Sequence, residues 1–204
     1  MKPPGLLTVK PPRGSPRRRE STLLDRLRAQ GLVLLPIHRL DAETSGVVLL
    51  ARDEESRAGM MRAFRAHEVE KTYLAFVQGR PDPGAGVIRA PILDRGARAE
   101  ISRRGQKAVT RYRVIETFAL ASLLEVVPET GRHNQIRIHF AHIGHPLVGE
   151  RKYARGSEAL VRHKRAALHA ARLTFTPPWS TDPLHIQAPL PVDLQNLSRK
   201  LRGS

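Results

Sequence analysis

The chain has 204 residues, of which 40% are hydrophobic and 26% charged, a composition typical of a globular protein rather than a fibrous or disordered one. Its 35 lysines and arginines exceed its 19 aspartates and glutamates and give a net charge of +16. A polyanion such as nucleic acid is therefore the expected partner, unless arginine is enriched by a bias of the genome or of growth temperature.

The length suits a single domain over residues 1–204, and no internal repeat or second-domain boundary is visible. We expect this domain to act as a monomer. The absence of cysteine excludes disulfides, thiolate metal sites and cysteine nucleophiles. No apolar run is long enough to span a membrane and no signal-like segment follows Met1, so we expect a cytoplasmic protein.

Capping residues and periodicity predict the first elements. Residues 11–20 combine prolines and arginines without periodicity, which predicts a flexible basic loop, either a solvated connector or an RNA-backbone contact. Residues 21–28 form a predicted capped helix. Asp53 begins a second predicted helix, in which Met61 and Phe64 are expected to anchor the core.

Strand-like runs alternate irregularly with helices along the chain. The predicted strands cover residues 32–37, 47–51, 71–79, 111–118, 121–127 and 168–175, the first two of them buried. Further helices are predicted over 133–143 and 193–201, and a turn over 81–86. Because strict βαβ alternation is absent, we expect an α+β fold with a mixed, largely antiparallel central sheet, flanked by helices and loops around a catalytic cleft.

One carboxylate stands out in the loop between the first two predicted strands. Residues 38–46 read H-R-L-D-A-E-T-S-G, with Asp41 among an arginine, two hydroxyls and a glycine. On chemical grounds Asp41 is a candidate nucleophile or base, although most loop aspartates only cap or face solvent.

This loop resembles the H-R-L-D-x-x-T-S-G motif of the RluA-type pseudouridine synthases. Four further elements of that family occur in the family's order and cover nearly the whole chain. They are K-P-x-G-L at residues 2–6, K-x-Y at 71–73, G-R-x-H-Q-I-R at 131–137 with G-H-P at 144–146, and L-H-A at 168–170. Five motifs in order make the resemblance strong.

The resemblance implies the isomerisation of uridine to pseudouridine in structured RNA, either ribosomal or transfer RNA. The N1–C1′ bond breaks, the uracil rotates and C5 joins C1′. The reaction needs no redox change, so we expect no cofactor and no metal. A flipped nucleotide is expected as substrate, because the sugar of a stacked base is out of reach.

The resemblance also implies roles for individual residues. Asp41 would act at the sugar, by attacking C1′ or removing the C2′ proton, and Arg39 would enter the gap left in the RNA or pair with Asp41 or a phosphate. Tyr73 would be a catalytic residue that stacks on the uracil and could take part in proton transfer, unless it only packs in its strand. Arg137 would pair with Asp41 and hold it ionised, unless it is a surface arginine. The further candidate substrate-binding residues are Thr44, Ile136 and Leu168, the last two of which core packing explains equally well.

The chain departs from the family pattern in three respects. The family usually has histidine where this chain has Asn134, and often aspartate where it has Glu150. Asn134 can still donate and accept hydrogen bonds, so we expect an altered supporting contact rather than lost activity. The sequence does not contain the strand that usually precedes K-P-x-G-L or the S4-like RNA-binding domain that many relatives carry. We therefore expect a catalytic domain with a lower affinity for RNA and a less complete sheet edge.

Three other functions compete with this interpretation. His133, His139, His142 and His145 favour a metal hydrolase, but no H-E-x-x-H motif or acidic ligand accompanies them. An aspartyl-phosphate enzyme would want a second aspartate where the chain has Glu43. An RNA-binding or ribosome-assembly module of the same fold without turnover is the remaining alternative.

Overall fold

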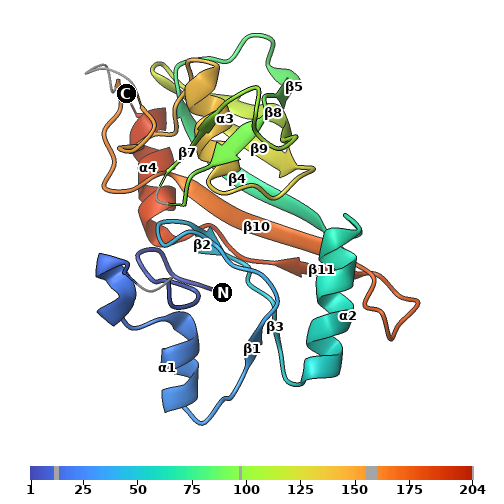
Figure 1. The fold of residues 1–204 in the computed structure, drawn as a ribbon. Coiled ribbons are helices and arrows are strands. Elements are labelled where there is room, and N and C mark those ends of the chain that lie inside the picture. The colour runs from blue at the N-terminus through green and yellow to red at the C-terminus, as the bar shows by residue number, and fades with distance from the viewer. Residues whose placement is uncertain (12–13, 97, 155–159, 204) are drawn as a thin grey trace. The chain divides into compact units, whose positions relative to one another are not determined.

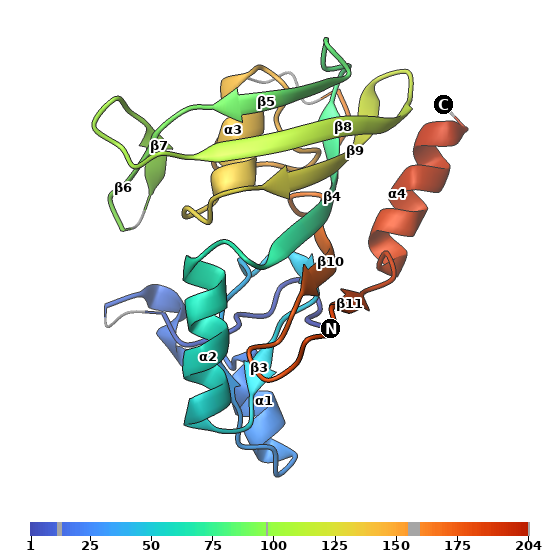
Figure 2. The same cartoon turned by 90° about the vertical axis from the view of Figure 1, so that its right-hand side faces the viewer.

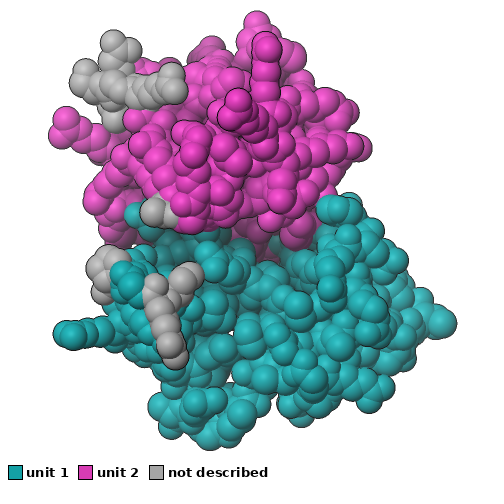
Figure 3. Space-filling view, viewed as in Figure 1, with its two compact units in different colours: residues 1–70, 172–189 teal, residues 71–171, 190–204 magenta. Residues whose placement is uncertain are grey.

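The computed structural model describes residues 1–11, 14–96, 98–154 and 160–203 (Figure 1). Their contacts form two compact units, each of which draws on two stretches of the chain (Figure 3). Unit 1 comprises Met1–Glu70 and Arg172–Pro189, and unit 2 comprises Lys71–Ala171 and Leu190–Ser204. Whether these two units together form the single domain expected over residues 1–204 depends on how they are arranged, so the single domain stays a prediction. None of the helices in the described ranges is long and apolar enough to cross a membrane.

Unit 1 holds short elements around a small core. They are η1 (Pro16–Arg19), α1 (Leu23–Ala29), β1 (Leu35–Pro36), β2 (Ser45–Gly46), β3 (Leu50–Ala51), α2 (Glu54–Arg65) and β11 (Leu184–Gln187). Strands β1 and β3 pair antiparallel, and β11 pairs antiparallel with residues 172–175 of β10 (Leu168–Phe175). Part of the predicted basic loop is therefore the 3-10 helix η1, while residues 12 and 13 lie outside the described ranges.

Side-chain caps fix where α1 and α2 begin, as the sequence predicts. The Thr22 hydroxyl accepts the N–H of Asp25 at 3.2 Å, and the Asp25 carboxylate accepts the N–H of Thr22 at 2.9 Å. Asp53 caps α2 by accepting the N–H of Ser56 at 2.7 Å.

The buried face of α2 lies one residue from the predicted one. Met60, not Met61, is buried in the core of unit 1 with Ala63, and Phe64 packs half-buried against it. Gly59 and Ala63 are four residues apart, so they lie on the same, buried face of the helix. Met61 lies at the edge of this face and is only half-buried.

The first predicted strand is wrong over most of its length. Leu32 and Val33 are 49% and 66% exposed, and only two residues of the run pair as β1. The cause lies in the end of α1, where Gly31 has φ +81° and donates to the Arg28 carbonyl at 3.0 Å while Leu32 donates to the Leu27 carbonyl at 2.9 Å. This Schellman motif uses the start of the apolar run to end the helix.

Unit 2 is built on an antiparallel sheet, which confirms the predicted fold class. Its strand order is β10-β4-β9-β8-β5, with β4 (Glu70–Gln78), β9 (Ala121–Pro128), β8 (Val109–Thr117) and β5 (Ala85–Arg89) side by side in Figure 2. Two helices cover it, α3 (Gln135–His142) and α4 (Val192–Arg202). A separate hairpin joins β6 (Ile92–Asp94) to β7 (Ala99–Ile101). The short strands β2, β5, β6, β7 and β11 were not predicted, and of the predicted strand 47–51 only Leu50–Ala51 is a strand, β3.

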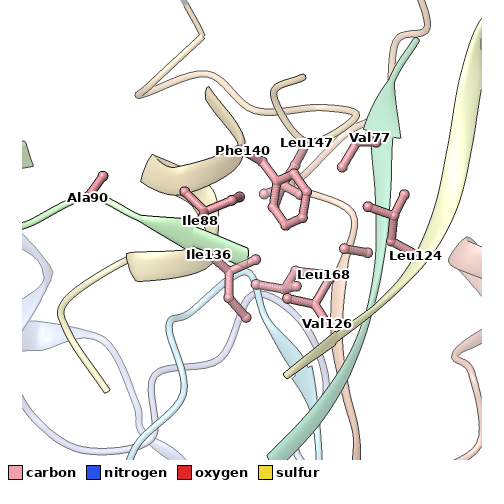
Figure 4. Close-up of a cluster of buried hydrophobic side chains, with 11 residues drawn as sticks. Val77, Ile88, Ala90, Leu124, Val126, Ile136, Phe140, Leu147 and Leu168 are labelled. Atoms are coloured by element: carbon pink, nitrogen blue, oxygen red, sulfur yellow. The ribbon is translucent and has the colours of Figure 1, made fainter. Parts of the chain in front are cut away.

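Successive side chains of β4 pack against different helices, one on each face of the sheet. Ala75 and Val77 of β4 pack in one cluster with Ile136 and Phe140 of α3, as Figure 4 shows for the labelled side chains. Phe76, between them, packs in another cluster with three leucines of α4. Because successive side chains of a strand point to opposite faces, α3 and α4 lie on opposite sides of the sheet.

Candidate active site

The loop that carries Asp41 is anchored from inside unit 1. Leu40, Ala42 and Thr44 are buried around Asp41, which is itself half-buried. The carbonyl of Asp41 accepts the N–H of Thr44 at 3.1 Å, which closes a turn over the polar residues. The loop therefore buries its neighbours and leaves the Asp41 side chain partly accessible.

Lys2 is the central support of this loop. Its side chain is fully buried, and its ammonium donates to the carbonyls of Pro3 at 3.0 Å, Leu6 at 2.7 Å and Ala42 at 3.0 Å. The Lys2 backbone also exchanges two hydrogen bonds with Gly46, at 2.8 and 3.0 Å. A buried charge is tolerated only with such partners, so the K-P-x-G-L element and the Asp41 loop form one hydrogen-bonded structure.

Two further contacts close the loop against its surroundings. The Thr8 hydroxyl contacts both the carbonyl and the N–H of Leu40, at 3.1 and 3.2 Å. His38 accepts the N–H of Leu49 at its Nε2 atom at 3.0 Å and stacks on Phe64 with ring centroids 4.8 Å apart. Arg39, between these two anchored positions, is exposed. Its backbone is thereby fixed while its side chain faces solvent.

The other predicted site residues lie in unit 2. Tyr73 of β4 pairs with Val126 of β9 and packs half-buried against the α3 cluster. Lys71, two residues earlier on the same strand face, is half-buried, and burial lowers the pKa of its ammonium. Sequence reasoning did not single out Lys71, although its place in the K-x-Y element was a signal.

Arg137 is held by a carboxylate that sequence reasoning noted only as a departure. Its Nε and Nη2 donate to the two oxygens of Glu150 at 2.7 and 2.8 Å, and its Nη1 donates to the Asn134 amide oxygen at 3.4 Å. The Glu150 carboxylate also accepts the N–H groups of Lys152 at 2.7 Å and Tyr153 at 3.2 Å. The guanidinium is thus fixed in a bidentate geometry.

The electrostatics of this pair favour the ionised carboxylate. The Glu150 side chain is fully buried and that of Arg137 is 10% exposed. Burial by itself would raise the pKa of Glu150, but its bonds to Arg137 and to two backbone N–H groups outweigh this effect and lower it. Asn134 adds a bond from its amide nitrogen to the Tyr153 hydroxyl at 2.7 Å. The two residues that differ from the family pattern, Asn134 and Glu150, therefore both contact Arg137.

The remaining three candidate substrate-binding residues are buried inside the two units. Ile136 and Leu168 are 6% and 4% exposed and belong to the α3 cluster, as ordinary core packing requires. Thr44 is buried in unit 1. A substrate-binding role for these three residues stays a prediction.

The predicted site residues divide between the two units. Arg39, Asp41 and Thr44 belong to unit 1, whereas the other four belong to unit 2. Their meeting in one catalytic cleft, and the pairing of Arg137 with Asp41, stay predictions.

The histidines of the rival metal site have other partners. Buried His139 contacts the Thr110 hydroxyl at 2.9 Å and the Ala90 carbonyl at 3.0 Å, and burial lowers the pKa of its imidazole. His145 contacts the Gln78 carbonyl at 2.9 Å. Across the part of the chain that the structure describes, no group of three or more potential ligands is placed to hold a metal ion.

Lys2→Met should destabilise the protein by about 3 kcal/mol, because three carbonyls, two of them in buried hydrogen bonds, lose their charged donor while the side-chain volume is kept. Urea unfolding measures the change, and hydrogen exchange should show faster exchange at the amide of Thr44. The control is Lys10→Met, whose exposed ammonium pairs with Asp25 and should cost less than about 1 kcal/mol. Equal stability of the two variants would contradict the role of Lys2.

Glu150→Gln should lower the free energy of unfolding by about 3 kcal/mol at neutral pH, because Arg137 would lose its buried counter-charge. Since the folded pKa of Glu150 is lowered, its stabilisation is complete above the ordinary carboxyl pKa and is lost as pH falls through the folded pKa. The variant should therefore lose less stability than the wild type on acidification.

Unfolding curves measured between neutral and acidic pH test this expectation. The matched control is Glu100→Gln, whose carboxylate pairs with Arg95 at the surface and should change stability by less than about 1 kcal/mol. If wild type and Glu150→Gln lose stability in parallel on acidification, the assigned cause is wrong.

Residues 1–142 match the model of the RNA pseudouridylate synthase family. An uncharacterized RNA pseudouridine synthase of Mycobacterium bovis is 42% identical over 172 residues, which are 82% of this chain and 56% of that protein. Ribosomal large subunit pseudouridine synthase D of Xylella fastidiosa is 39% identical over 222 residues, with 98% of this chain and 65% of that protein covered. The chain thus spans between about half and two thirds of the length of these relatives.

A solved structure, human RNA pseudouridylate synthase domain containing 4, is similar over 98% of this chain and 88% of its own, with a TM-score of 0.78 and 27% identity. A second, human RNA pseudouridylate synthase domain containing 1, covers 90% of this chain and 86% of its own with a TM-score of 0.72 and 26% identity. The family match over residues 1–142 and the identities to relatives agree with the motif order, and the chain belongs to the RNA pseudouridylate synthase family, among its RluA-type members.

Proposed function

We propose that this protein isomerises uridine to pseudouridine in RNA, with Asp41 as the catalytic carboxylate. The observation that carries the proposal is the Asp41 loop. It has the family's motif, its backbone is anchored by Lys2, and its one aspartate is half-buried between buried neighbours. Such a carboxylate is fixed in place and still accessible to a substrate.

The reaction leaves the elemental composition of the nucleotide unchanged. The N1–C1′ bond breaks with assistance from Asp41, the uracil turns, and the C5–C1′ bond forms. The proton on C5 is then released and N1 takes up a proton, so no oxidant, reductant or second substrate is consumed. Asp41 either attacks C1′ directly or removes the C2′ proton, and both routes use its ionised form.

The other residues have supporting roles in this proposal. Tyr73 would stack on the uracil, and Arg39 would contact the RNA beside the flipped nucleotide. Arg137 would direct the carboxylate of Asp41, and its bidentate bond to Glu150 supports this role because it fixes the plane of the guanidinium. The apolar residues Ile136 and Leu168 would limit water near the reacting sugar.

We propose large-subunit ribosomal RNA as the substrate, in preference to transfer RNA. The names of relatives such as the Xylella fastidiosa protein and ribosomal large subunit pseudouridine synthase C of Vibrio cholerae, 35% identical over 182 residues, support this choice. The net charge of +16 suits a polyanion of this kind. The proposed enzyme works as a monomer in the cytoplasm and without a metal.

Asp41→Asn should reduce pseudouridine formation at least about a thousandfold, because the amide cannot act as a nucleophile or base. RNA binding should be retained, since the loop keeps its shape. Release of tritium from RNA labelled at C5 of uridine measures the reaction. Glu55→Gln, which removes an exposed carboxylate at the start of α2, is the control and should retain wild-type activity. Substantial turnover by Asp41→Asn would overturn the assignment.

Pseudouridine mapping tests the proposed substrate. Cells that lack this protein should lose pseudouridine at one or a few positions of large-subunit ribosomal RNA, and the purified protein should restore them in RNA from those cells. Loss confined to transfer RNA would redirect the substrate to that class. An unchanged map, together with RNA binding by the pure protein, would favour the binding or ribosome-assembly module without turnover.

A further inference from the structure

Trp179 is the exception among the aromatic residues of this chain. The five phenylalanines and three tyrosines are all buried or half-buried, whereas Trp179, the single tryptophan, is 64% exposed. Its large apolar surface gains free energy when it leaves water. Tryptophan is also among the residues that contribute most at binding surfaces, so its exposed ring is a candidate contact.

The chain around Trp179 holds it in a defined position. It lies in the loop 176–183 between β10 and β11, where the N–H of Ser180 donates to the Pro177 carbonyl at 3.0 Å. This bond closes a β-turn with Pro178 in its second position, which suits the fixed φ of proline, and Trp179 in its third. The Ser180 hydroxyl then accepts the N–H of Asp182 at 3.1 Å. The indole is therefore presented by an ordered turn.

The turn is fastened to helix α2 at a glycine. A Cβ on Gly59 would lie 3.3 Å from Cγ of Pro178, so the absence of a side chain gives the proline ring its place on the helix. The same point lies 3.8 Å from Nη2 of Arg62. The guanidinium of Arg62 thus lies beside Pro178, next to Trp179 in the chain, and Figure 1 shows this loop beside α2.

Two arginines lie in the part of α2 that the turn contacts, and Asp182 is the one carboxylate in the loop itself. Arg62 and Arg65 both lie in the last turn of α2, and Nε of Arg65 donates to the Met61 carbonyl at 3.2 Å. For exposed Arg62, no carboxylate partner occurs among the described residues. An exposed indole on a turn whose neighbouring Pro178 meets α2 near the Arg62 guanidinium combines a stacking surface with a phosphate-binding group.

We propose that Trp179 and Arg62 bind an unpaired nucleotide of RNA outside the reacting uridine. The indole stacks on the base, and the guanidinium binds the phosphate of the same or the adjacent nucleotide. A base pair within a duplex hides its ring faces, so the contact selects single-stranded or looped RNA. This inference rests on the proposed RNA substrate, but it concerns affinity and not the chemistry at Asp41.

Intrinsic fluorescence tests the contact directly, because Trp179 is the only tryptophan. The full chain is titrated with a short oligouridylate and with a blunt RNA duplex, and binding is followed in parallel by the anisotropy of labelled RNA. Oligouridylate should quench the fluorescence in a saturable way, whereas the duplex should bind through charge with little quenching. Oligouridylate that binds without quenching overturns the inference and leaves Trp179 to a protein partner.

Variants separate stacking from charge. Trp179→Ala should weaken oligouridylate binding about tenfold, within the range for loss of one stacked base, and Trp179→Phe should recover most of it. Arg62→Gln should weaken binding and reduce the slope of log affinity against log salt by about one. Arg28→Gln, which removes an exposed arginine of α1 in the same unit, is the control for net charge. Equal effects of Arg62→Gln and Arg28→Gln would contradict a specific contact.

Two further measurements keep this inference distinct from the proposed function. The melting temperature of Trp179→Ala should equal that of the wild type, because the side chain is exposed, so weaker binding cannot be ascribed to unfolding. The inactive Asp41→Asn variant should still show quenching. Unchanged affinity of Trp179→Ala for RNA that the wild type modifies would refute the stacking contact alone, whereas absence of any RNA binding or turnover would refute both.

Discussion

The candidate catalytic loop depends on one buried cation. A lysine almost never lies fully inside a protein, because its charge must leave water, yet the ammonium of Lys2 does so with three carbonyl acceptors. One of these carbonyls belongs to Ala42, the residue after Asp41, and the same oxygen also accepts the N–H of Gly5 at 2.8 Å. The backbone at Asp41 is therefore set by a segment forty residues away, and the first residues of the chain are part of the site's architecture.

Ion pairs between arginines and glutamates determine where the positive charge of the protein remains uncompensated. On the sheet of unit 2, arginines of β8 and α4 are neutralised by nearby glutamates. These pairs are Arg111–Glu129, Arg113–Glu125 and Arg202–Glu116. Because these three pairs carry no net charge, the net charge of +16 comes from basic residues outside such pairs, and Arg62 is one of them. Net charge alone predicts a polyanionic partner, whereas the ion pairs indicate which arginines are available to bind it.

The sequence predicted those parts of the fold in which local signals suffice. The eight-residue strand 168–175 and the capped start of α2 agree with the structure, because periodicity and an aspartate cap act over short distances. The two-residue β1 could not be predicted, since Leu32 is used to end α1 through a bond that the hydropathy of the run does not encode. For the candidate site, the motifs selected Asp41 and Arg137 as candidates, but neither the burial of Lys2 nor the hydrogen bonds that Arg137 donates to Glu150 leave a sequence signal. Both depend on tertiary contacts between distant segments.

In the proposed roles, different residues of unit 1 provide RNA affinity and catalysis. Asp41 is rigidly supported and half-buried, which suits a group that must meet one atom of the substrate with little freedom. Trp179 is exposed on an ordered turn, which suits a group that must accept any unpaired base with a free ring face. Stacking is tolerant of sequence, so Trp179 and Arg62 would hold RNA without choosing the uridine. The choice of target would then fall to the shape of the RNA around the flipped nucleotide and to contacts such as that of Arg39.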